Sequence, residues 1–218
     1  MKPLIIAIDG PSGAGKGTVA RAVASALGYR HIDSGAMYRA VGWKAVRDGV
    51  RLDDEDAVAA VARSPIDLST ARVAIDGHEV TRAIRTPEID RAAAAVARLP
   101  RVRAVLVDRL REMGEQGEIV MEGRDIGTVV FPRADVKVFL DAAPEERARR
   151  RASDPAHTGG PAAVADVKTL LVERDRSDST RTASPLYAAA DAVLVDTTGR
   201  SIEDVVREVL SVVRGKRN

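Results

Sequence analysis

The residues with the plainest chemical meaning lie near the N-terminus, in the stretch GPSGAGKGT at residues 10–18. A glycine-rich loop of the form G-x-x-x-x-G-K-[ST] surrounds phosphate oxygens with its backbone N–H groups, and its lysine reaches the terminal phosphates. The stretch follows an apolar run at 4–8 and opens a helical pattern, which is the context that such a loop needs. We therefore predict a nucleotide-phosphate site formed by Gly10, Pro11, Ser12, Gly13, Ala14, Gly15, Lys16, Gly17 and Thr18.

The loop departs from the usual pattern directly after its lysine. Gly17 stands where a serine or threonine would bind magnesium, and Thr18 comes one position late. This spelling resembles the loop of nucleoside monophosphate kinases, and it disfavours a GTPase switch, as does the lack of an N-K-x-D motif. Because Mg²⁺ gives up water reluctantly, we expect it to enter as MgATP, held by nucleotide oxygens and water with no protein ligand. Thr18 would then face the α-phosphate.

The elements that must position this loop are apolar runs that look like buried strands. They lie at residues 4–8, 29–32, 118–122, 136–140 and 192–196. Helical stretches separate them, and this alternation predicts a parallel sheet with helices on both faces. Val129 and Val130 are ambiguous between strand and loop. Ser201 and Asp204 form a capping-box pattern that predicts a final helix.

Two stretches interrupt the alternation. Residues 34–99 carry a helical pattern, a β-hairpin signal at Asp76-Gly77 and an Ala-rich helix, so we expect an insertion with its own small structure. Residues 152–166 concentrate small residues, Gly and Pro, which predicts a mobile flap. The chain is accordingly divided into a discontinuous core at 1–33, 100–151 and 180–218, an insertion at 34–99 and a lid region at 152–179.

Composition restricts the class of protein. The 218 residues are 45% hydrophobic and include no cysteine, so the chain can bury a sizeable core but has no disulfide or thiolate metal site. Its net charge of +2 comes from 34 basic and 32 acidic residues, which is not the profile of a nucleic-acid-binding protein. No signal peptide or apolar run of about 18 residues is present. We expect a soluble cytoplasmic monomer without nucleic-acid or membrane partners.

Four further motifs connect the loop to one family. They are DSGAMYR at 33–39, PRVR at 100–103, GRDIGTVVFP at 123–132 and ERDRSDSTR at 173–181. In order and spacing the chain resembles bacterial cytidylate kinases over nearly its whole length, and GRDIGT is the most specific element. The resemblance implies a three-layer α/β P-loop NTPase fold with a five-stranded parallel sheet, a monophosphate-binding insertion and a short lid. It also implies transfer of the γ-phosphoryl group of MgATP to CMP or dCMP.

The resemblance implies a role for each matching residue. Asp125 would accept a hydrogen bond from the exocyclic amine of cytosine and repel the carbonyl that uracil carries there. Three arginines would clamp the monophosphate, and a planar guanidinium suits that task. The implied CMP-binding set is Ser34, Tyr38, Arg39, Arg103, Arg124, Asp125, Arg174, Asp178 and Arg181. The set that would neutralise charge on the transferred group is Lys16, Arg39, Arg124, Arg181 and the lid arginines Arg150 and Arg151.

One departure from the family leaves base choice open. The family usually carries a serine that contacts the cytosine ring, and Ala94 stands at that position. One lost hydrogen bond is worth about 0.5–1.5 kcal/mol net, so selectivity would be softened. The alternatives are a kinase acting on UMP, AMP or a hydroxyl-bearing metabolite, and a nucleotide-dependent regulator that binds ATP without phosphorylating a small molecule.

Overall fold

The computed structural model describes residues 3–69, 72–154 and 164–217. Within these ranges, five strands form one sheet in the order β2-β6-β1-β7-β8, and every neighbouring pair is parallel. The strands are β1 (Ile5–Asp9), β2 (Arg30–Asp33), β6 (Ile119–Gly123), β7 (Val136–Asp141) and β8 (Val193–Asp196). All five apolar runs are therefore strands of a parallel sheet, and the predicted α/β fold is confirmed.

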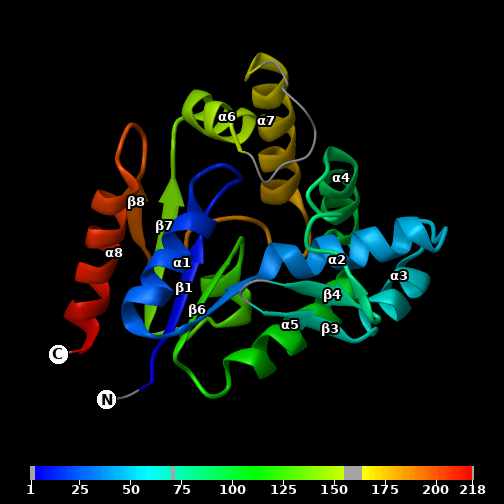
Figure 1. The fold of residues 1–218 in the computed structure, drawn as a ribbon, viewed down its shortest axis with the longest axis horizontal. Helices are drawn as coiled ribbons and strands as arrows, with labels where there is room; N and C mark the ends of the chain where they lie inside the picture. The colour runs from blue at the N-terminus through cyan, green and yellow to red at the C-terminus, as the bar shows by residue number, and fades with distance from the viewer. Residues whose placement is uncertain (1–2, 70–71, 155–163, 218) are drawn as a thin grey trace.

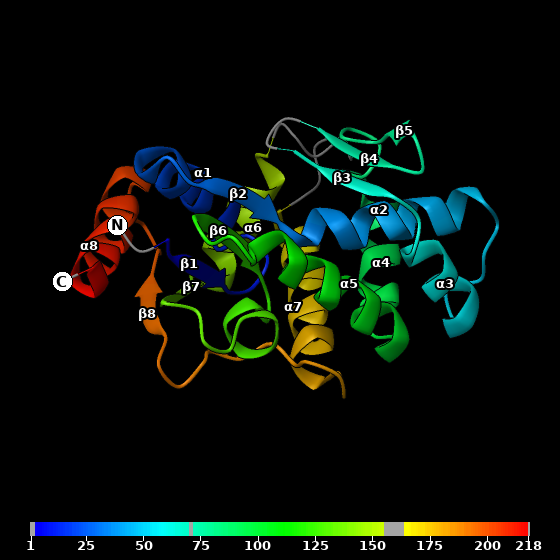
Figure 2. The same cartoon turned by 90° about the horizontal axis from the view of Figure 1, so that it is seen from below.

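Helices cover both faces of this sheet, as Figure 1 shows and the view turned by 90° in Figure 2 confirms. Successive side chains of a strand point to opposite faces. In β1, Ile6 belongs to the cluster that includes α1 (Lys16–Leu27) and α8 (Ile202–Arg217), whereas Ala7 belongs to the cluster that includes α5 (Pro100–Gly114). Both side chains are fully buried. The strand that carries the phosphate loop thus lies at the centre of three packed layers.

Local signals set the ends of two core helices. Gly28 ends α1 with a left-handed φ of 69°, a conformation that glycine adopts without steric cost. At the start of α8, the N–H of Asp204 donates to the hydroxyl of Ser201 at 3.1 Å, so Ser201 caps the helix and the predicted final helix is confirmed. Val129 and Val130, whose sequence was ambiguous, belong to a π-helical turn at Ile126–Val130.

The insertion has the small structure that its sequence predicts, with additions. The hairpin turns at Asp76 and Gly77, whose φ angles are 51° and 76°. A third strand and a short helix, which the sequence analysis did not identify, complete it. A Cβ on Gly42, in the first helix of the insertion, would lie 3.1 Å from the Cβ of Ala92 in its last helix. These small residues therefore let the two helices pack closely. The elements are α2 (Ser34–Arg47), α3 (Glu55–Ala62), β3 (Ile66–Leu68), β4 (Val73–Ile75), β5 (His78–Glu79) and α4 (Pro87–Val96).

Two helices lie over the open end of the sheet (Figure 1). They are α6 (Pro144–Ala152) and α7 (Val164–Thr180), and they pack through a cluster of Ala148, Val167 and Leu171. Most of the predicted flap, at residues 155–163, lies outside the described residues, while its two ends belong to these helices. None of the helices in the described ranges is long and apolar enough to span a bilayer.

Candidate active site

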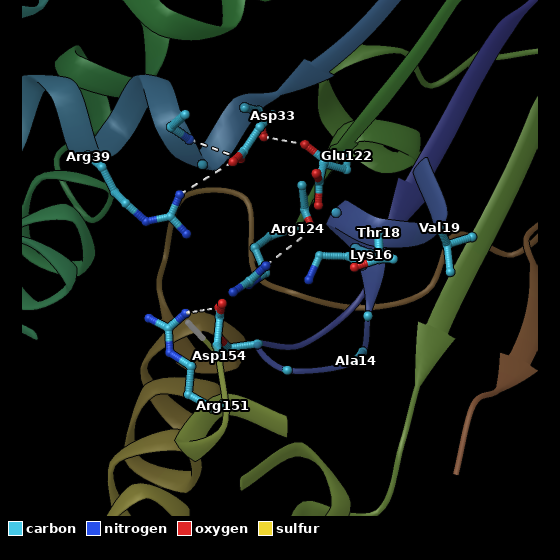
Figure 3. A pocket seen from close by; sticks show the side chains of 18 of the residues that line it. Ala14, Lys16, Thr18, Val19, Asp33, Arg39, Glu122, Arg124, Arg151 and Asp154 are labelled. Atoms are coloured by element: carbon cyan, nitrogen blue, oxygen red, sulfur yellow. Dashed lines mark hydrogen bonds and ion pairs between the residues drawn. The ribbon is translucent and has the colours of Figure 1, made fainter. Parts of the chain in front are cut away.

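A cleft of about 1150 Å³ opens at the carboxyl ends of the parallel strands, where ligands bind in open α/β sheets. The glycine-rich loop, the insertion and the helices α6 and α7 all contribute side chains to it. Figure 3 shows Lys16, Arg39, Arg124 and Arg151 converging on this space from different elements. Of the residues singled out in the sequence, only Gly10 and Pro11 do not line the cleft, and they lie at the base of the loop.

The loop has the backbone geometry of a phosphate cradle. A Cβ on Gly10, whose φ is 146°, would lie 2.0 Å from the carbonyl oxygen of Leu140, so no other residue fits between β1 and β7. Gly15 has a left-handed φ of 90° and caps the start of α1, so that the first N–H groups of the helix point to the cleft. The loop therefore presents unpaired donors and a helix N-terminus to an anion.

Lys16 lies folded against this loop. Its Nζ donates to the carbonyl oxygen of Pro11 at 2.8 Å, and the side chain is buried. Burial, and then the nearby positive charge of Arg124, lower the pKa of Lys16 to about 7. A phosphate oxygen placed between these two cations would relieve their repulsion. The electrostatics of this corner of the cleft thus favour an anion.

Carboxylates that the sequence analysis did not single out stand at the strand ends. The Oε1 atom of Glu122 lies 3.1 Å from the position of a Cβ on Gly17, so a carboxylate fills the space of the missing metal-binding hydroxyl. Glu122 also bonds to Nε2 of His31 at 3.1 Å. Asp9 accepts the N–H groups of Ile126 and Gly127 at 2.8 and 2.7 Å, and burial raises its pKa to about 6. The sequence feature that could have identified Asp9 and Glu122 is their position at the ends of the strands β1 and β6.

One carboxylate, that of Glu122, and the guanidinium of Arg21 lie beside Gly17. Glu122 is an oxygen donor of the type that Mg²⁺ prefers, and it can accept hydrogen bonds from water bound to the ion. Across the three described ranges, no three His, Asp or Glu side chains are grouped as a metal site. The carboxylate of Glu122 beside Gly17 therefore fits an Mg²⁺ ion that is bound through water.

The residues expected to read the base come together from α2, α5 and the loop after β6. Asp125 is only 5% exposed and pairs with Arg103, while Nη2 of Arg181 lies 3.8 Å from its other oxygen. The guanidinium of Arg103 lies 5.5 Å from the ring centre of Tyr38, and burial raises the pKa of that phenol to about 12. Ser34 donates to the carbonyl oxygen of Glu122 at 2.7 Å. Together these side chains form one buried wall of the cleft that can hydrogen-bond to a ligand.

The predicted phosphate clamp lies beside this wall. Arg39, Arg124 and Arg181 all line the cleft with Lys16. Arg124 Nε donates to Asp178 at 3.1 Å, and Arg181 Nη1 lies 3.7 Å from the same carboxylate. Burial works against ionisation of Asp178, but Arg124 and then Arg174 outweigh it and lower its pKa. The three arginines thus lie at one cleft, as the clamp hypothesis requires.

The lid arginines reach the cleft from α6. Arg150 donates to the carbonyl oxygen of Thr197 at 2.6 Å, and its Nη1 lies 3.7 Å from the position of a Cβ on Gly15. Arg151 pairs with Asp90 on α4. Arg147, which the sequence analysis did not assign to the site, is buried and donates to the carbonyl oxygen of Ser12 at 3.1 Å. This hydrogen bond holds the glycine-rich loop in place.

The insertion helix α4 supplies one surface of the cleft. Ala94 lines the cleft with its methyl group. The family that the chain resembles usually carries a serine at this position. One turn earlier, Asp90 pairs with arginines of three other helices. No sequence motif indicated this role. The first turn of a helix often carries an acidic residue for its dipole, so the type of Asp90 alone is uninformative.

Comparisons with known proteins match nearly the whole chain to one family. A family model described as cytidylate kinase matches residues 6–215. A protein named cytidylate kinase from Desulfitobacterium hafniense (strain Y51) is 48% identical over 219 residues, covering 99% of this chain and 94% of that protein. One from Solibacter usitatus (strain Ellin6076) is 46% identical, with 99% and 94% covered.

Solved structures share the fold at low identity. A gluconokinase from Sinorhizobium meliloti 1021 superposes with a TM-score of 0.54 at 17% identity, covering 99% of this chain and 95% of that chain. A shikimate kinase from Acinetobacter baumannii, in complex with shikimate, gives 0.52 at 14% identity, with 98% and 94% covered. At these identities the two structures support the three-layer α/β fold alone.

Proposed function

The chain belongs to the cytidylate kinase family, and we propose that its cleft transfers the γ-phosphoryl group of MgATP to CMP or dCMP. The products are ADP and CDP or dCDP. The observation that carries this proposal is a single cleft lined both by the loop with Lys16 and by Arg39, Arg124 and Arg181. A phosphoryl group can pass between two nucleotides only where their phosphates meet in line.

On the donor side, we propose that residues 10–18 hold the phosphates of ATP. Backbone N–H groups of the loop and the start of α1 would bind the β-phosphate, and Lys16 would leave the Pro11 carbonyl for a γ-oxygen. Arg150 and Arg151, at the end of α6 that adjoins the lid at residues 152–179, would neutralise the outer phosphate oxygens of ATP. Water exclusion by the lid would suppress ATP hydrolysis.

On the acceptor side, the monophosphate would lie among Arg39, Arg124 and Arg181. Two buried nitrogens there, Nη1 of Arg39 and Nη2 of Arg181, donate no hydrogen bond within the described ranges, although each lies 3.6–3.8 Å from a carboxylate. Several cations around one dianion fix its attacking oxygen and lower the repulsion between the two phosphates. The new bond joins this oxygen to the γ-phosphorus while the bond to the ADP oxygen breaks. A phosphate oxygen needs no protein nucleophile to activate it.

For the base, we propose that Asp125 accepts the exocyclic amine of cytosine. Its pairing with Arg103 and Arg181 fixes the position of its carboxylate, and Arg103 can donate to the ring's acceptors. Ser34 and Tyr38 would complete this subsite within the insertion at 34–99. Arg174 and Asp178 of α7 would bind the sugar. The methyl group of Ala94 offers no hydrogen bond to the ring, so discrimination would rest mainly on Asp125.

Magnesium would be held by the β and γ oxygens of ATP and by water. Glu122, beside Gly17, would accept hydrogen bonds from that water and orient it. When bound, the ion neutralises charge that develops on the transferred group.

An acceptor profile tests the proposal. MgATP is supplied with CMP, dCMP, UMP, AMP, gluconate or shikimate in turn, and ADP formation is measured. We expect turnover with CMP and dCMP, weaker turnover with UMP, and none with the two hydroxyl acceptors. ADP formation that does not depend on any added monophosphate would instead support a nucleotide-dependent regulator.

A further inference from the structure

Asp90 lies in the first turn of α4 and holds three arginines that the proposed reaction needs. Its Oδ1 accepts from Nε of Arg39 at 3.2 Å and lies 3.4 Å from Nη1 of Arg174. Its Oδ2 pairs with Arg151. These arginines come from α2, α7 and α6, so one carboxylate joins the insertion to both lid helices.

The surroundings of Asp90 resemble those of a bound phosphate. The side chain is only 14% exposed, and the three guanidinium groups around it are 14–20% exposed. Multiple arginines around one anion are the usual means of phosphate recognition. Two of these arginines also keep buried nitrogens without a hydrogen bond in the described chain, namely Nε of Arg174 and Nη1 of Arg39, which lies 3.6 Å from Oδ2 of Asp33. The three arginines line the cleft, so its surface beside Asp90 has donors for a second anion.

A role in helix capping does not explain this arrangement. Thr86 already caps α4 by accepting from the N–H of Ile89 at 3.2 Å, and Glu88 supplies an acidic side chain to the first turn. Asp90 instead directs its carboxylate to side chains of other helices.

We propose that Asp90 is an internal counter-ion that competes with the acceptor's phosphate for Arg39, and that it thereby sets the affinity for the monophosphate. The inference rests on the proposed function of Arg39 as a phosphate clamp. An incoming phosphate must displace the Asp90 carboxylate from Nε of Arg39 or accept its repulsion at close range. Either event weakens binding of any phosphate-bearing ligand, and neither affects the base and sugar.

The test compares the unaltered chain with Asp90→Asn by calorimetric binding of inorganic phosphate, CMP and cytidine. A charge-assisted hydrogen bond corresponds to about tenfold in affinity, so Asp90→Asn should bind phosphate and CMP about tenfold more tightly. Cytidine, which lacks phosphate, should bind with unchanged affinity. Weaker or unchanged phosphate binding by Asp90→Asn would overturn the proposal, because Asp90 would then position the arginines without competing.

The matched control is Asp154→Asn. Asp154 lies 3.8 Å from Arg151, so this variant removes the same charge from the same lid arginine but leaves the pairs of Arg39 and Arg174 intact. We expect a much smaller gain in phosphate affinity. An equal gain would indicate a general effect of net charge and would also overturn the proposal.

Two further measurements keep the test decisive. If Asp90→Asn does not fold, Asp90→Ser replaces it, and the rise in melting temperature on adding phosphate is compared with that of the unaltered chain. A larger rise in the variant supports competition, and an equal or smaller rise contradicts it. Failure of the proposed function would appear separately, as absent phosphorylation of CMP by the unaltered chain, whereas the phosphate measurements test Asp90 alone.

Discussion

Replacement of Asp125 by asparagine tests base recognition most sharply. The change keeps the shape of the side chain but replaces one acceptor oxygen with an amide donor. Asp125 is 5% exposed, so water cannot replace a lost contact with cytosine. A good base contact is worth about 1–3 kcal/mol, which corresponds to roughly a five- to 150-fold lower kcat/KM for CMP. An amide donor suits the uracil carbonyl, so kcat/KM for UMP should fall less or rise.

The assay measures kcat/KM for CMP and UMP under one set of conditions, and the quantity of interest is their ratio. The substitution also removes a charge that pairs with Arg103 and Arg181, so the variant should be less stable. Melting temperatures with saturating ATP separate this loss from recognition. Asp191→Asn, which removes an exposed carboxylate paired with Lys137, serves as the control for charge. An unchanged CMP to UMP ratio in the Asp125 variant would refute the assigned role.

Three other changes have defined outcomes. Because the pKa of Lys16 is about 7 and an ATP phosphate would raise it, ATP binding should take up a proton and weaken as the pH rises above 7; calorimetry in buffers of different ionisation enthalpy measures this, and Lys16→Met should abolish the uptake. Gly17→Ser should lower kcat/KM for MgATP severalfold in steady-state assays, because the added Cβ lies 3.1 Å from Glu122; full activity would show that this crowding is harmless. Ala94→Ser should raise the preference for CMP over UMP by about two- to tenfold in kcat/KM, the worth of one hydrogen bond, and no gain would place residue 94 away from the base.

Stability should also depend on pH through Lys16. Its pKa is about 7 in the folded chain and near 10.5 in an unfolded one, so between these values the unfolded chain binds more protons. The free energy of unfolding therefore gains a contribution from this group as the pH rises from about 7 to 10. Chemical denaturation of the unaltered chain and of Lys16→Met across this range measures the difference, and parallel pH profiles would contradict the buried, neutral lysine.

Most of the core could be predicted because its signals are local. Four of the five strands of the parallel sheet are apolar runs bounded by polar or glycine residues, and the hairpin needs only Asp76-Gly77. The helix α3 was missed because eight residues carry little periodicity, although Asp54 caps it by accepting from Ala57 at 3.0 Å. The strand β3 was missed because three residues cannot show alternation.

The parts of the site that escaped prediction depend on tertiary contacts. Glu122 is one more polar residue at the end of β6 until the fold places it beside Gly17. Asp90 has the type and position of an ordinary helix-dipole residue, and only the approach of α2, α6 and α7 reveals its three arginines. Arg147 is one of several arginines on α6 and was not assigned to the site, yet it supports the loop by donating to the Ser12 carbonyl.

The central claim is that the donor and acceptor phosphates share one cleft. Adenosine and cytidine joined by a chain of five phosphates would occupy both halves at once, with its phosphates between Lys16 and Arg39. Steady-state inhibition by this compound is the most direct test. The account predicts inhibition that is competitive with ATP and also competitive with CMP, at concentrations well below either KM. Inhibition that is competitive with only one of the two substrates would contradict it.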